Sequence, residues 1–344
     1  MDLHLTSYGA KIRVRQGLFA VKYFDEEMIL HRKEYAPSEL DCIWLYPPTS
    51  LSVEVIKLAA QHEIEIIFVG ERDMPMGRYS SYVPRGSSKV AKAQFIVSVS
   101  PKLSFPVVKD LLLRKINSQA DFLRKVAKRS KKENGELLFY LDAIEDSFQK
   151  MQAMEGILDD AMKQSLRGIE GTSSRNFYAA INTTLLPRYR FNGRSRRPVK
   201  DAFNAFLNYA FALLYTEVER ALVRAGIQPI IGLMHREGYQ LKSMVYDFIE
   251  PFRADTVWVV YQLFVRERIS LQEHVSDLGA RVDVAREGKR LLIPTWNKYY
   301  KERRTKAFGM NLIRNEIIKR EAELLATRLL KISKLASYES LDYV

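Results

Sequence analysis

The first hundred residues alternate between apolar and polar positions over short runs. The run at 11–21 alternates, and 41–45 and 65–69 are apolar or β-branched runs bounded by turn residues. Such patterns predict strands, whereas 51–62 has its apolar positions at helical spacing. The stretch 75–89 is rich in Gly, Pro and Ser and is expected to be a loop or hairpin. This region is therefore predicted to be β-rich with at least one helix.

Helical apolar spacing begins near residue 106 and continues almost to the end of the chain. Breaks rich in Gly, Pro or charge separate the predicted helices. We expect a boundary near 98–106, with a β-rich domain at 1–98 and a helical domain at 99–344. The predicted fold class is α+β, a small β-rich N-terminal domain followed by a larger all-α domain. The predicted helices cover 107–126, 137–164, 201–225, 242–252, 257–268 and 310–332.

Composition adds an excess of positive charge to this picture. The chain has 344 residues, 54 of them Lys or Arg and 41 Asp or Glu, and its formal net charge is +13. Its 47% hydrophobic and 28% charged residues are ordinary for globular proteins, which excludes a disordered, collagen-like or low-complexity chain. The charge suits a partner such as nucleic acid, although a solvated basic surface would give the same balance.

Cysteine usage and apolar run length indicate the compartment. Cys42 is the only cysteine, which excludes an internal disulfide framework and Cys-clustered zinc or iron–sulfur sites. The N-terminus lacks the pattern of a signal peptide, and no run of about 18 uncharged apolar residues is long enough to span a membrane. We therefore expect a cytoplasmic protein with no membrane partner.

Two acids lie three residues apart in the apolar segment 243–253. A helix would place the carboxylates of Asp247 and Glu250 on one face. The apolar neighbours indicate partial burial, where a charge is tolerated only when it is paired or bound to a metal. A metal site and a plain ion pair with Arg253 or Arg236 both remain open.

Glu170 and His235 are the other candidates for chemistry. Glycines flank Glu170, which would permit a sharp turn and the close approach of another element. The alternative is a helix start capped by Thr172 or Ser173, where the helix dipole favours an acid. His235 follows an apolar turn just ahead of the segment with the paired acids, although most of the five histidines should be surface or packing residues.

The segment 186–200 is the densest basic stretch near these acids. Tyr189 and Phe191 interrupt its cations, an arrangement that suits a phosphate backbone and unstacked bases. A solvated loop is the alternative, and the basic clusters at 124–132 and 298–306 share this ambiguity.

Several common enzyme classes lose support because their motifs are absent from the sequence. It has no phosphate-binding P-loop, no Gly-x-Gly-x-x-Gly after a strand, no Gly-x-Ser-x-Gly elbow and no His-Glu-x-x-His. The remaining candidate is a site of carboxylates and histidine beside positive charge.

Four sequence blocks occur together in an order that is specific to one family. They are GIEGTSSRNFY at 168–178, FNGRSRRPVKDAFNAFLNYAFALL at 191–214, AGIQPIIGLMH at 225–235 and SMVYDFIEPFR at 243–253. In this order they resemble the CRISPR-associated spacer-acquisition integrase, also called the Cas-one endonuclease. Weaker similarity at 115–123 and in the N-terminal region extends the resemblance over most of the chain.

The resemblance implies a set of site residues. Glu170, His235 and Glu250 would coordinate a catalytic Mg²⁺ or Mn²⁺, with Asp247 as a supporting catalytic acid. Hard oxygen ligands and one imidazole suit these ions better than a closed zinc site. The candidate DNA-binding side chains are Arg175, Arg194, Arg196, Arg197 and Arg253.

The implied function is that of a metal-dependent DNA endonuclease/integrase of CRISPR adaptation. It would insert short DNA segments (spacers) into the CRISPR array by attack of a 3′-hydroxyl on a phosphodiester, in a catalytic domain at 99–344. The implied partners are DNA (prespacer and CRISPR repeat), a second copy of the chain that forms a homodimer through 1–98, and a small Cas-two subunit. The alternative is a non-enzymatic basic DNA-binding or architectural protein.

One block departs from the family pattern. The family commonly continues the Glu-Pro-Phe-Arg sequence with a proline and then an Asp-Arg pair, whereas this chain has Ala254 and the pair Trp258-Val259. The departure concerns local packing and leaves the proposed ligands intact.

Overall fold

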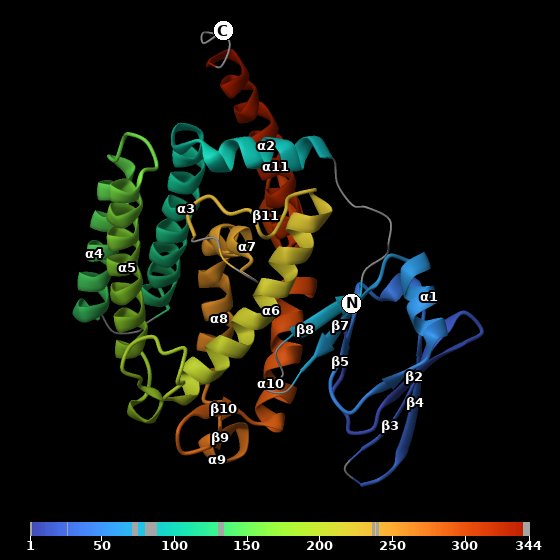
Figure 1. Cartoon of the computed structure of the whole chain (residues 1–344). Coiled ribbons are helices and arrows are strands. Elements are labelled where there is room, and N and C mark those ends of the chain that lie inside the picture. Colours follow the sequence, from blue (N-terminus) through green and yellow to red (C-terminus); the bar gives the residue numbers. More distant parts are fainter. Residues whose placement is uncertain are drawn as a thin grey trace. The chain divides into compact units, whose positions relative to one another are not determined.

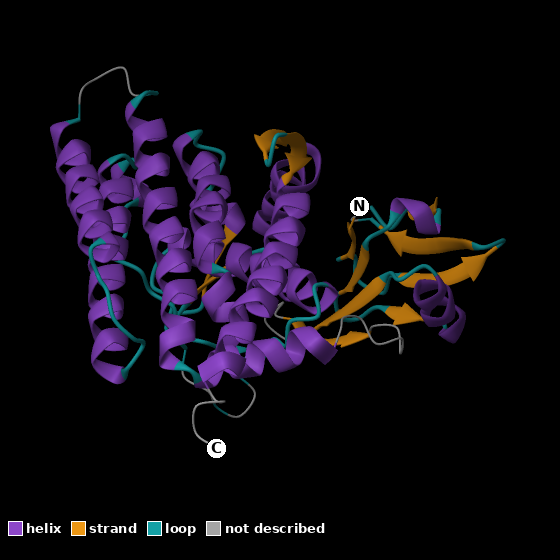
Figure 2. Ribbon diagram, turned by 90° about the horizontal axis from the view of Figure 1, so that it is seen from above, coloured by secondary structure: helices purple, strands orange, loops and turns teal. Residues whose placement is uncertain are grey.

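The chain folds into two compact units, Met1–Pro84 and Arg85–Val344, in a computed structural model (Figure 1). The second unit begins ahead of the expected boundary near 98–106, because the helix Ser88–Val99 packs against helices of that unit. Strands dominate the first unit and helices the second (Figure 2). The structure describes residues 2–25, 27–70, 75–79, 88–129, 134–235, 238 and 241–339.

Two sheets and one helix form the first unit. One sheet has the order β1-β5-β7-β8, with β8 antiparallel to β7 and the other neighbours parallel, and the other sheet has the order β4-β3-β2-β6. Ile12, Phe19, Ile43, Ile66 and Val55 come from both sheets and from α1 and share one buried core. The elements are β1 (Asp2–Leu5), β2 (Lys11–Arg15), β3 (Leu18–Phe24), β4 (Leu30–Tyr35), the 3₁₀ turn η1 (Pro37–Glu39), β5 (Cys42–Leu45), β6 (Ser50–Leu51), α1 (Val53–Gln61), β7 (Glu65–Val69) and β8 (Pro75–Tyr79).

The patterned runs of the N-terminal region form the expected elements. The runs 41–45 and 65–69 are strands, and 51–62 contains α1. The alternating run 11–21 forms the hairpin β2–β3, which turns at Gln16-Gly17, where both residues have positive φ. Within 75–89, β8 pairs with β7 as a hairpin would, while residues 80–87 lie outside the described part.

The second unit is helical, with two small hairpins, and the α+β class is confirmed. None of its described helices is long and apolar enough to cross a membrane. The helices are α2 (Ser88–Val99), α3 (Pro101–Ala127), α4 (Gly135–Gln152), α5 (Asp160–Thr183), η3 (Pro187–Tyr189), α6 (Ala202–Arg224), α7 (Ser243–Phe248), η4 (Glu250–Phe252), α8 (Arg253–Val265), α9 (Leu271–His274), α10 (Arg286–Asn297), η5 (Lys298–Glu302) and α11 (Arg314–Glu339). The hairpins join β9 (Val275–Asp277) to β10 (Val282–Val284) and β11 (Arg304–Ala307) to β12 (Met310–Ile313).

The helix predicted at 137–164 is two helices. The first ends at Gln152, and the second begins at Asp160, where the N-cap Asp159 accepts a hydrogen bond from the Met162 amide. Gly156, with φ +136°, lies in the connection, because only glycine adopts this conformation readily. The predicted helix pattern was continuous because apolar residues occur on both sides of this break.

Helix α5 continues much further than predicted and places Glu170 in its interior. The expected sharp turn around Glu170 is therefore wrong, and so is the alternative of a helix start. Thr172 donates a hydrogen bond to the Gly168 carbonyl, and Ser173 donates one to Gln119 on α3, so neither hydroxyl caps a helix end.

The core of the second unit surrounds α6, which is buried on nearly every face. A helix that is hydrophobic all round belongs in the interior of a bundle. Helices α3, α4 and α5 pack side by side, and α3 also contacts η4 and α8 (Figure 1). The long helix α3 therefore brings α5 and the short α7–η4–α8 segment to one place.

Candidate active site

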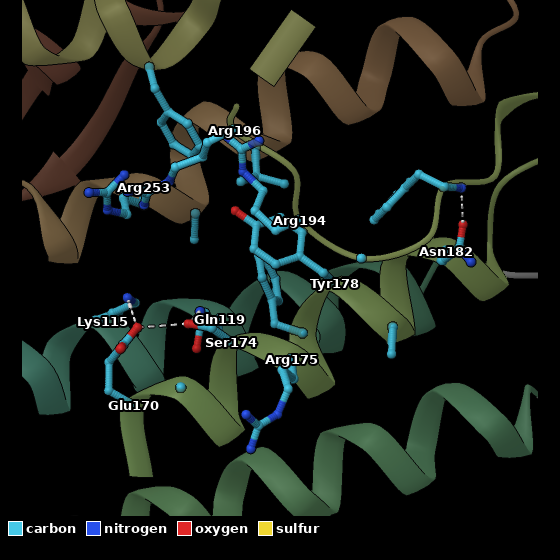
Figure 3. A pocket seen from close by; sticks show the side chains of 18 of the residues that line it. Lys115, Gln119, Glu170, Ser174, Arg175, Tyr178, Asn182, Arg194, Arg196 and Arg253 are labelled. Carbon is cyan, nitrogen blue, oxygen red and sulfur yellow. Dashed lines mark hydrogen bonds and ion pairs between the residues drawn. The ribbon is translucent and has the colours of Figure 1, made fainter. Parts of the chain in front are cut away.

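Two acids that are far apart in the sequence meet at one lysine. Lys115 on α3 forms an ion pair with Glu170 on α5 (Figure 3). Its Nζ also lies 2.5 Å from Oε2 of Glu250 at the start of η4. The side chains of Lys115 and Glu250 are 8% and 7% exposed, and that of Glu170 is 25% exposed. The two candidate ligands therefore share a single buried cation.

A second cation completes the charge balance around Glu250. Arg253 Nε donates to Glu250 Oε1 at 2.9 Å, and its guanidinium also donates to the Tyr215 hydroxyl. Burial acts to raise the pKa of Glu250, but Arg253 and Lys115 outweigh burial and bring that pKa to about 2. Burial likewise acts to lower the pKa of Lys115, yet Glu250 and Glu170 raise it. Glu250 and Lys115 are both charged as a result.

A proline sets the position of Glu250. Helix α7 ends at Phe248, and Pro251, which has no N–H to continue the helical hydrogen bonds, lies in the 3₁₀ turn η4 before α8 begins at Arg253. Asp247 and Glu250 consequently have separate partners, and the expectation that they share one face of a continuous helix is wrong.

Asp247 organises the loop that carries His235. Its Oδ2 accepts hydrogen bonds from the amides of Leu233 and Met234, and its Oδ1 accepts one from the amide of His235. The same Oδ1 lies 2.6 Å from His235 Nδ1. Asp247 is only 3% exposed, whereas the His235 side chain is 41% exposed. A carboxylate on Nδ1 fixes the imidazole ring and leaves Nε2 for a metal or a proton.

Gly232 allows this loop to approach α7. A Cβ atom at residue 232 would lie 2.5 Å from the Cβ of Ser243 and 3.2 Å from Oδ2 of Asp247. No side chain fits that space, so the amides of 233–235 reach Asp247 only because residue 232 is glycine. Sequence reasoning did not single out Gly232.

Sequence reasoning also missed the contribution of α3. Gln119, one turn after Lys115, accepts from Ser173 at 2.7 Å and lies 3.3 Å from Ser174 Oγ, which itself donates to Glu170. This network joins α3 to α5 next to the ion pair. The signal in the sequence is a pair of polar residues at i and i+4 on a face of α3 that is otherwise apolar.

A cleft of about 450 Å³ opens beside Glu170 and Lys115. Arginines and aromatic rings from α5, the basic loop, α6 and α8 line it, which gives it a cationic wall next to Glu170 (Figure 3). The charged and aromatic residues of this lining are Lys115, Glu170, Arg175, Phe177, Tyr178, Phe191, Arg194, Arg196, Phe211 and Arg253.

The arginines of the basic loop have different environments. Arg194 donates to the side-chain oxygens of Asn204 and Asn208 on α6, and burial lowers its pKa. It anchors the loop to the helix. Arg196, which lines the cleft, and Arg197 are both exposed. Of the three candidate DNA-binding arginines in this loop, Arg196 and Arg197 are thus accessible to a ligand.

The remaining two candidate arginines lie on the helices beside the cleft. Arg175 is exposed on α5 and donates to Thr172 at 3.0 Å. Arg253 lines the cleft but already pairs with Glu250. Both stand next to the acids, one on each side of the cleft (Figure 3).

Within the residues that the structure describes, no three His, Cys, Asp or Glu side chains lie close enough together to hold a metal ion. Glu170 and Glu250 meet at Lys115, while His235 is held by Asp247. The donor set nevertheless suits a hard divalent ion. Oε2 of Glu250 is buried against the Lys115 ammonium, so a cation already occupies the position that a divalent ion would take at this oxygen.

The departure at Trp258-Val259 has a structural explanation. Trp258 is buried on α8, and its ring packs edge-on against Phe122 of α3. Lys125 Nζ lies 3.8 Å from the ring centre and the Arg129 guanidinium 4.9 Å from it. Cations over an indole face are attracted to it, so Trp258 joins α8 to α3.

Acids beside a cationic cleft, with an oriented histidine in the same unit, are features suited to an enzyme that works on phosphodiesters. The profile of the family "CRISPR associated protein Cas1" matches residues 3–298, and the chain belongs to that family. Its curated relatives are named CRISPR-associated endonucleases, and the alternative of a non-enzymatic DNA-binding protein is not favoured.

Curated relatives resemble the chain over nearly its whole length. The CRISPR-associated endonuclease Cas1 1 of Archaeoglobus fulgidus is 26% identical over 92% of this chain and 93% of its own. The CRISPR-associated endonuclease Cas1 1 of Thermus thermophilus is 26% identical over 96% of each chain.

Solved structures share the fold. A casposase bound to integration product has a TM-score of 0.80 at 18% identity and covers 96% of this chain and 90% of its own. A Cas1 protein from Thermotoga maritima has a TM-score of 0.77 at 19% identity, over 96% and 97% of the two chains. A Cas6-RT-Cas1–Cas2 complex contains a chain with a TM-score of 0.73 at 18% identity, over 96% of this chain and 35% of that one.

Proposed function

We propose that this chain joins the 3′-hydroxyl end of a DNA segment to a phosphodiester of a CRISPR array, at the cleft beside Glu170. The observation that carries the proposal is the convergence of Glu170 and Glu250 on one buried cation position next to a cleft lined with arginines. Acids alone would repel DNA, and arginines alone would bind it without chemistry. Their combination suits phosphoryl transfer.

Glu170, Glu250 and His235 would hold a divalent ion, Mg²⁺ or Mn²⁺. When bound, such an ion polarises a phosphoryl oxygen and stabilises the charge of the transition state. His235 would contribute Nε2, because Asp247 occupies Nδ1. Asp247 is then a positioning residue: it orients the imidazole and the loop amides instead of contacting the ion.

The chain's own cations would bind the two DNA strands. Arg196 and Arg175 are exposed at the cleft and suit phosphate oxygens, and the aromatic ring of Tyr178 suits an unpaired base. In the joining step the 3′-hydroxyl of the segment loses its proton and its oxygen forms a bond to a phosphorus of the array strand. The bond between that phosphorus and the 3′-oxygen of the array strand breaks, and this oxygen takes up a proton. With water in place of the hydroxyl the same step is hydrolysis.

The partners we propose are prespacer and repeat DNA, a second copy of the chain and a Cas2 subunit. DNA is supported by the net charge of +13 and by the cationic cleft. The Cas2 subunit is supported by the similar chain in the solved complex named Cas6-RT-Cas1–Cas2.

The test is a joining reaction with purified protein. A labelled duplex with a 3′-hydroxyl and a supercoiled plasmid with CRISPR repeats are incubated with Mn²⁺ or with a chelator. We expect labelled plasmid only when the metal is present. A duplex with 3′-dideoxy ends is the matched control and should not be joined.

Each outcome has a distinct meaning. Nicked plasmid without joined label would make the chain a nuclease that does not transfer strands. Joining that persists in chelator, or in the Glu170→Gln variant, would remove the metal or Glu170 from the mechanism.

A further inference from the structure

The ion cluster at the site is electrically balanced before any metal enters it. Glu170 and Glu250 carry two negative charges, and Lys115 and Arg253 carry two positive charges in contact with them. Lys115 reaches both acids, and its side chain is 8% exposed. The ammonium therefore lies between the acids that would bind the metal.

This arrangement differs from an ordinary buried ion pair. Lys301 lies 3.6 Å from Glu217, which also pairs with Arg220, and none of these three residues lines the cleft. Lys115, in contrast, lines the cleft and contacts two candidate metal ligands from different helices. Structural support of the fold would need only one of these acids.

We propose that Lys115 is a resident cation that weakens divalent-metal binding between Glu170 and Glu250 until a DNA phosphate enters the cleft. The inference rests on the proposed function, because it takes these acids as metal ligands. Lys115 is on this account a positioning residue, which holds both carboxylates in place and tunes their affinity for the metal.

The physical reason is repulsion between like charges. A divalent ion that approaches the two acids meets the Lys115 ammonium at close range, and it brings two positive charges to a cluster that is already neutral. A DNA phosphate adds negative charge at the same place. Metal and DNA should therefore bind cooperatively, and each should raise the affinity for the other by the same factor.

The experiment measures metal affinity directly. The free Mn²⁺ signal in electron paramagnetic resonance gives the Mn²⁺ dissociation constant of the full chain, with and without a short DNA duplex, after subtraction of the Mn²⁺ that the duplex binds alone. Wild type, Lys115→Met and Lys115→Arg are compared. Lys109→Met is the matched control, because Lys109 lies on the same helix and donates to the carbonyls of Gln152 and Met154.

In wild type we expect weak Mn²⁺ binding that DNA tightens. Lys115→Met should bind Mn²⁺ at least about tenfold more tightly without DNA. The repulsion between charges a few ångströms apart is large enough to change a dissociation constant by more than about tenfold. Addition of DNA should then tighten Mn²⁺ binding by Lys115→Met only slightly. Lys115→Arg and Lys109→Met should behave like wild type. Unchanged or weaker Mn²⁺ binding by folded Lys115→Met would overturn the inference.

Stability provides a second readout. Lys115→Met leaves the buried Glu250 and the partly buried Glu170 without their shared cation, so its melting temperature in chelator should fall and Mn²⁺ should restore it. If this variant is unfolded in chelator, refolding by Mn²⁺ supports the inference and failure to refold overturns it.

The same titration separates this inference from the proposed function. If Glu170→Gln in wild-type background leaves Mn²⁺ binding in the presence of DNA unchanged, the metal assignment itself fails. If Glu170→Gln abolishes that binding but Lys115→Met leaves the Mn²⁺ affinity without DNA unchanged, only the role of Lys115 fails.

Discussion

Glu170 is an acid in the middle of a long helix with a glycine on either side. Gly168 and Gly171 lie in helical conformation in α5, and a Cβ atom at either position would meet nothing within 4 Å. A glycine in a helix interior costs about 0.5–1 kcal/mol relative to alanine. Packing within the described residues does not require the two glycines, and a ligand in the cleft is a reason for Gly171, which lines it.

Alanine at the two positions separates stability from binding. Gly168→Ala and Gly171→Ala should each raise the free energy of unfolding by about 0.5–1 kcal/mol in urea titrations. Gly171 lines the cleft and Gly168 does not, so only Gly171→Ala should weaken DNA binding. Equal DNA affinity of both variants would show that the strand does not approach α5 at Gly171.

The two glutamates should differ in stability although both are needed for joining. Glu250→Gln leaves the buried cations Lys115 and Arg253 short of a partner and should cost about 3–5 kcal/mol. Glu170→Gln removes a more exposed carboxylate and leaves Lys115 paired with Glu250, so its cost should be smaller. Chemical denaturation without metal measures both, and a costlier Glu170→Gln would contradict the observed burial.

At the scale of elements, the short segment α7–η4–α8 directs one acid to the histidine loop and the other to α3. The loop in turn depends on close contact between Gly232 and Ser243. Six residues of helix are too few to hold this geometry alone, so the contacts of Asp247 with the loop amides fix it. Loss of these contacts should therefore first change the position of the His235 imidazole.

Gly232→Ala tests the contact between the loop and α7. The added methyl group would overlap Ser243, so the loop must move away from Asp247. We expect loss of joining activity and a change in the His235 imidazole resonances in NMR spectra. Gly168→Ala is the matched control, because a Cβ atom at this helical position would meet no other atom within 4 Å. Gly193→Ala is a poor control, because Gly193 has a positive φ that strains alanine. Full activity of Gly232→Ala would show that the loop position is not critical.

The arginines of the basic loop should have two roles: Arg194 stabilises the loop, and Arg196 and Arg197 bind DNA. Neutralising Arg196 and Arg197 together should weaken DNA binding for unrelated sequences and reduce the salt slope by at most about 1.8, at roughly 0.9 per phosphate. Arg194→Gln should instead lower the melting temperature, because Arg194 bonds Asn204 and Asn208. An unchanged salt slope in the double variant would make the exposed arginines ordinary surface residues.

At the scale of the whole molecule, the β-rich unit offers a surface for a second copy. In the described part of the unit, exposed apolar side chains gather where β3 meets β4, and β4 is an edge of its sheet. Exposed apolar patches and sheet edges are typical of interaction surfaces. The apolar side chains at this hairpin are Phe24, Met28, Ile29 and Leu30.

We expect a dimer of about twice the monomer mass of 39.9 kDa in sedimentation at micromolar concentration. Insertion of a segment needs two joining events, and two linked sites raise the effective concentration of the second. Phe24→Asp combined with Leu30→Lys should produce a monomer that retains its melting temperature, because both side chains are exposed. Tyr8→Asp, at another exposed position, is the control. A dimer that survives the double change would place the interface elsewhere.

The sequence by itself determined the fold class, the family and which residues are candidates for chemistry. Apolar periodicity identifies a strand or helix because burial of one face is a local property of each segment, as for β5, β7 and α6. The ordered blocks around Glu170, His235 and Glu250 identified the family, since the order of residues along the chain can be compared without knowing the structure.

Only the tertiary structure decided what those residues contact. Helical packing places Lys115 between Glu170 and Glu250, and the proline after Glu250 separates this acid from Asp247. Neither fact follows from local spacing, because each depends on helices that are distant in the sequence. The role of Gly232 likewise depends on a neighbour across the fold, where the space left for one methyl group decides whether the loop reaches Asp247.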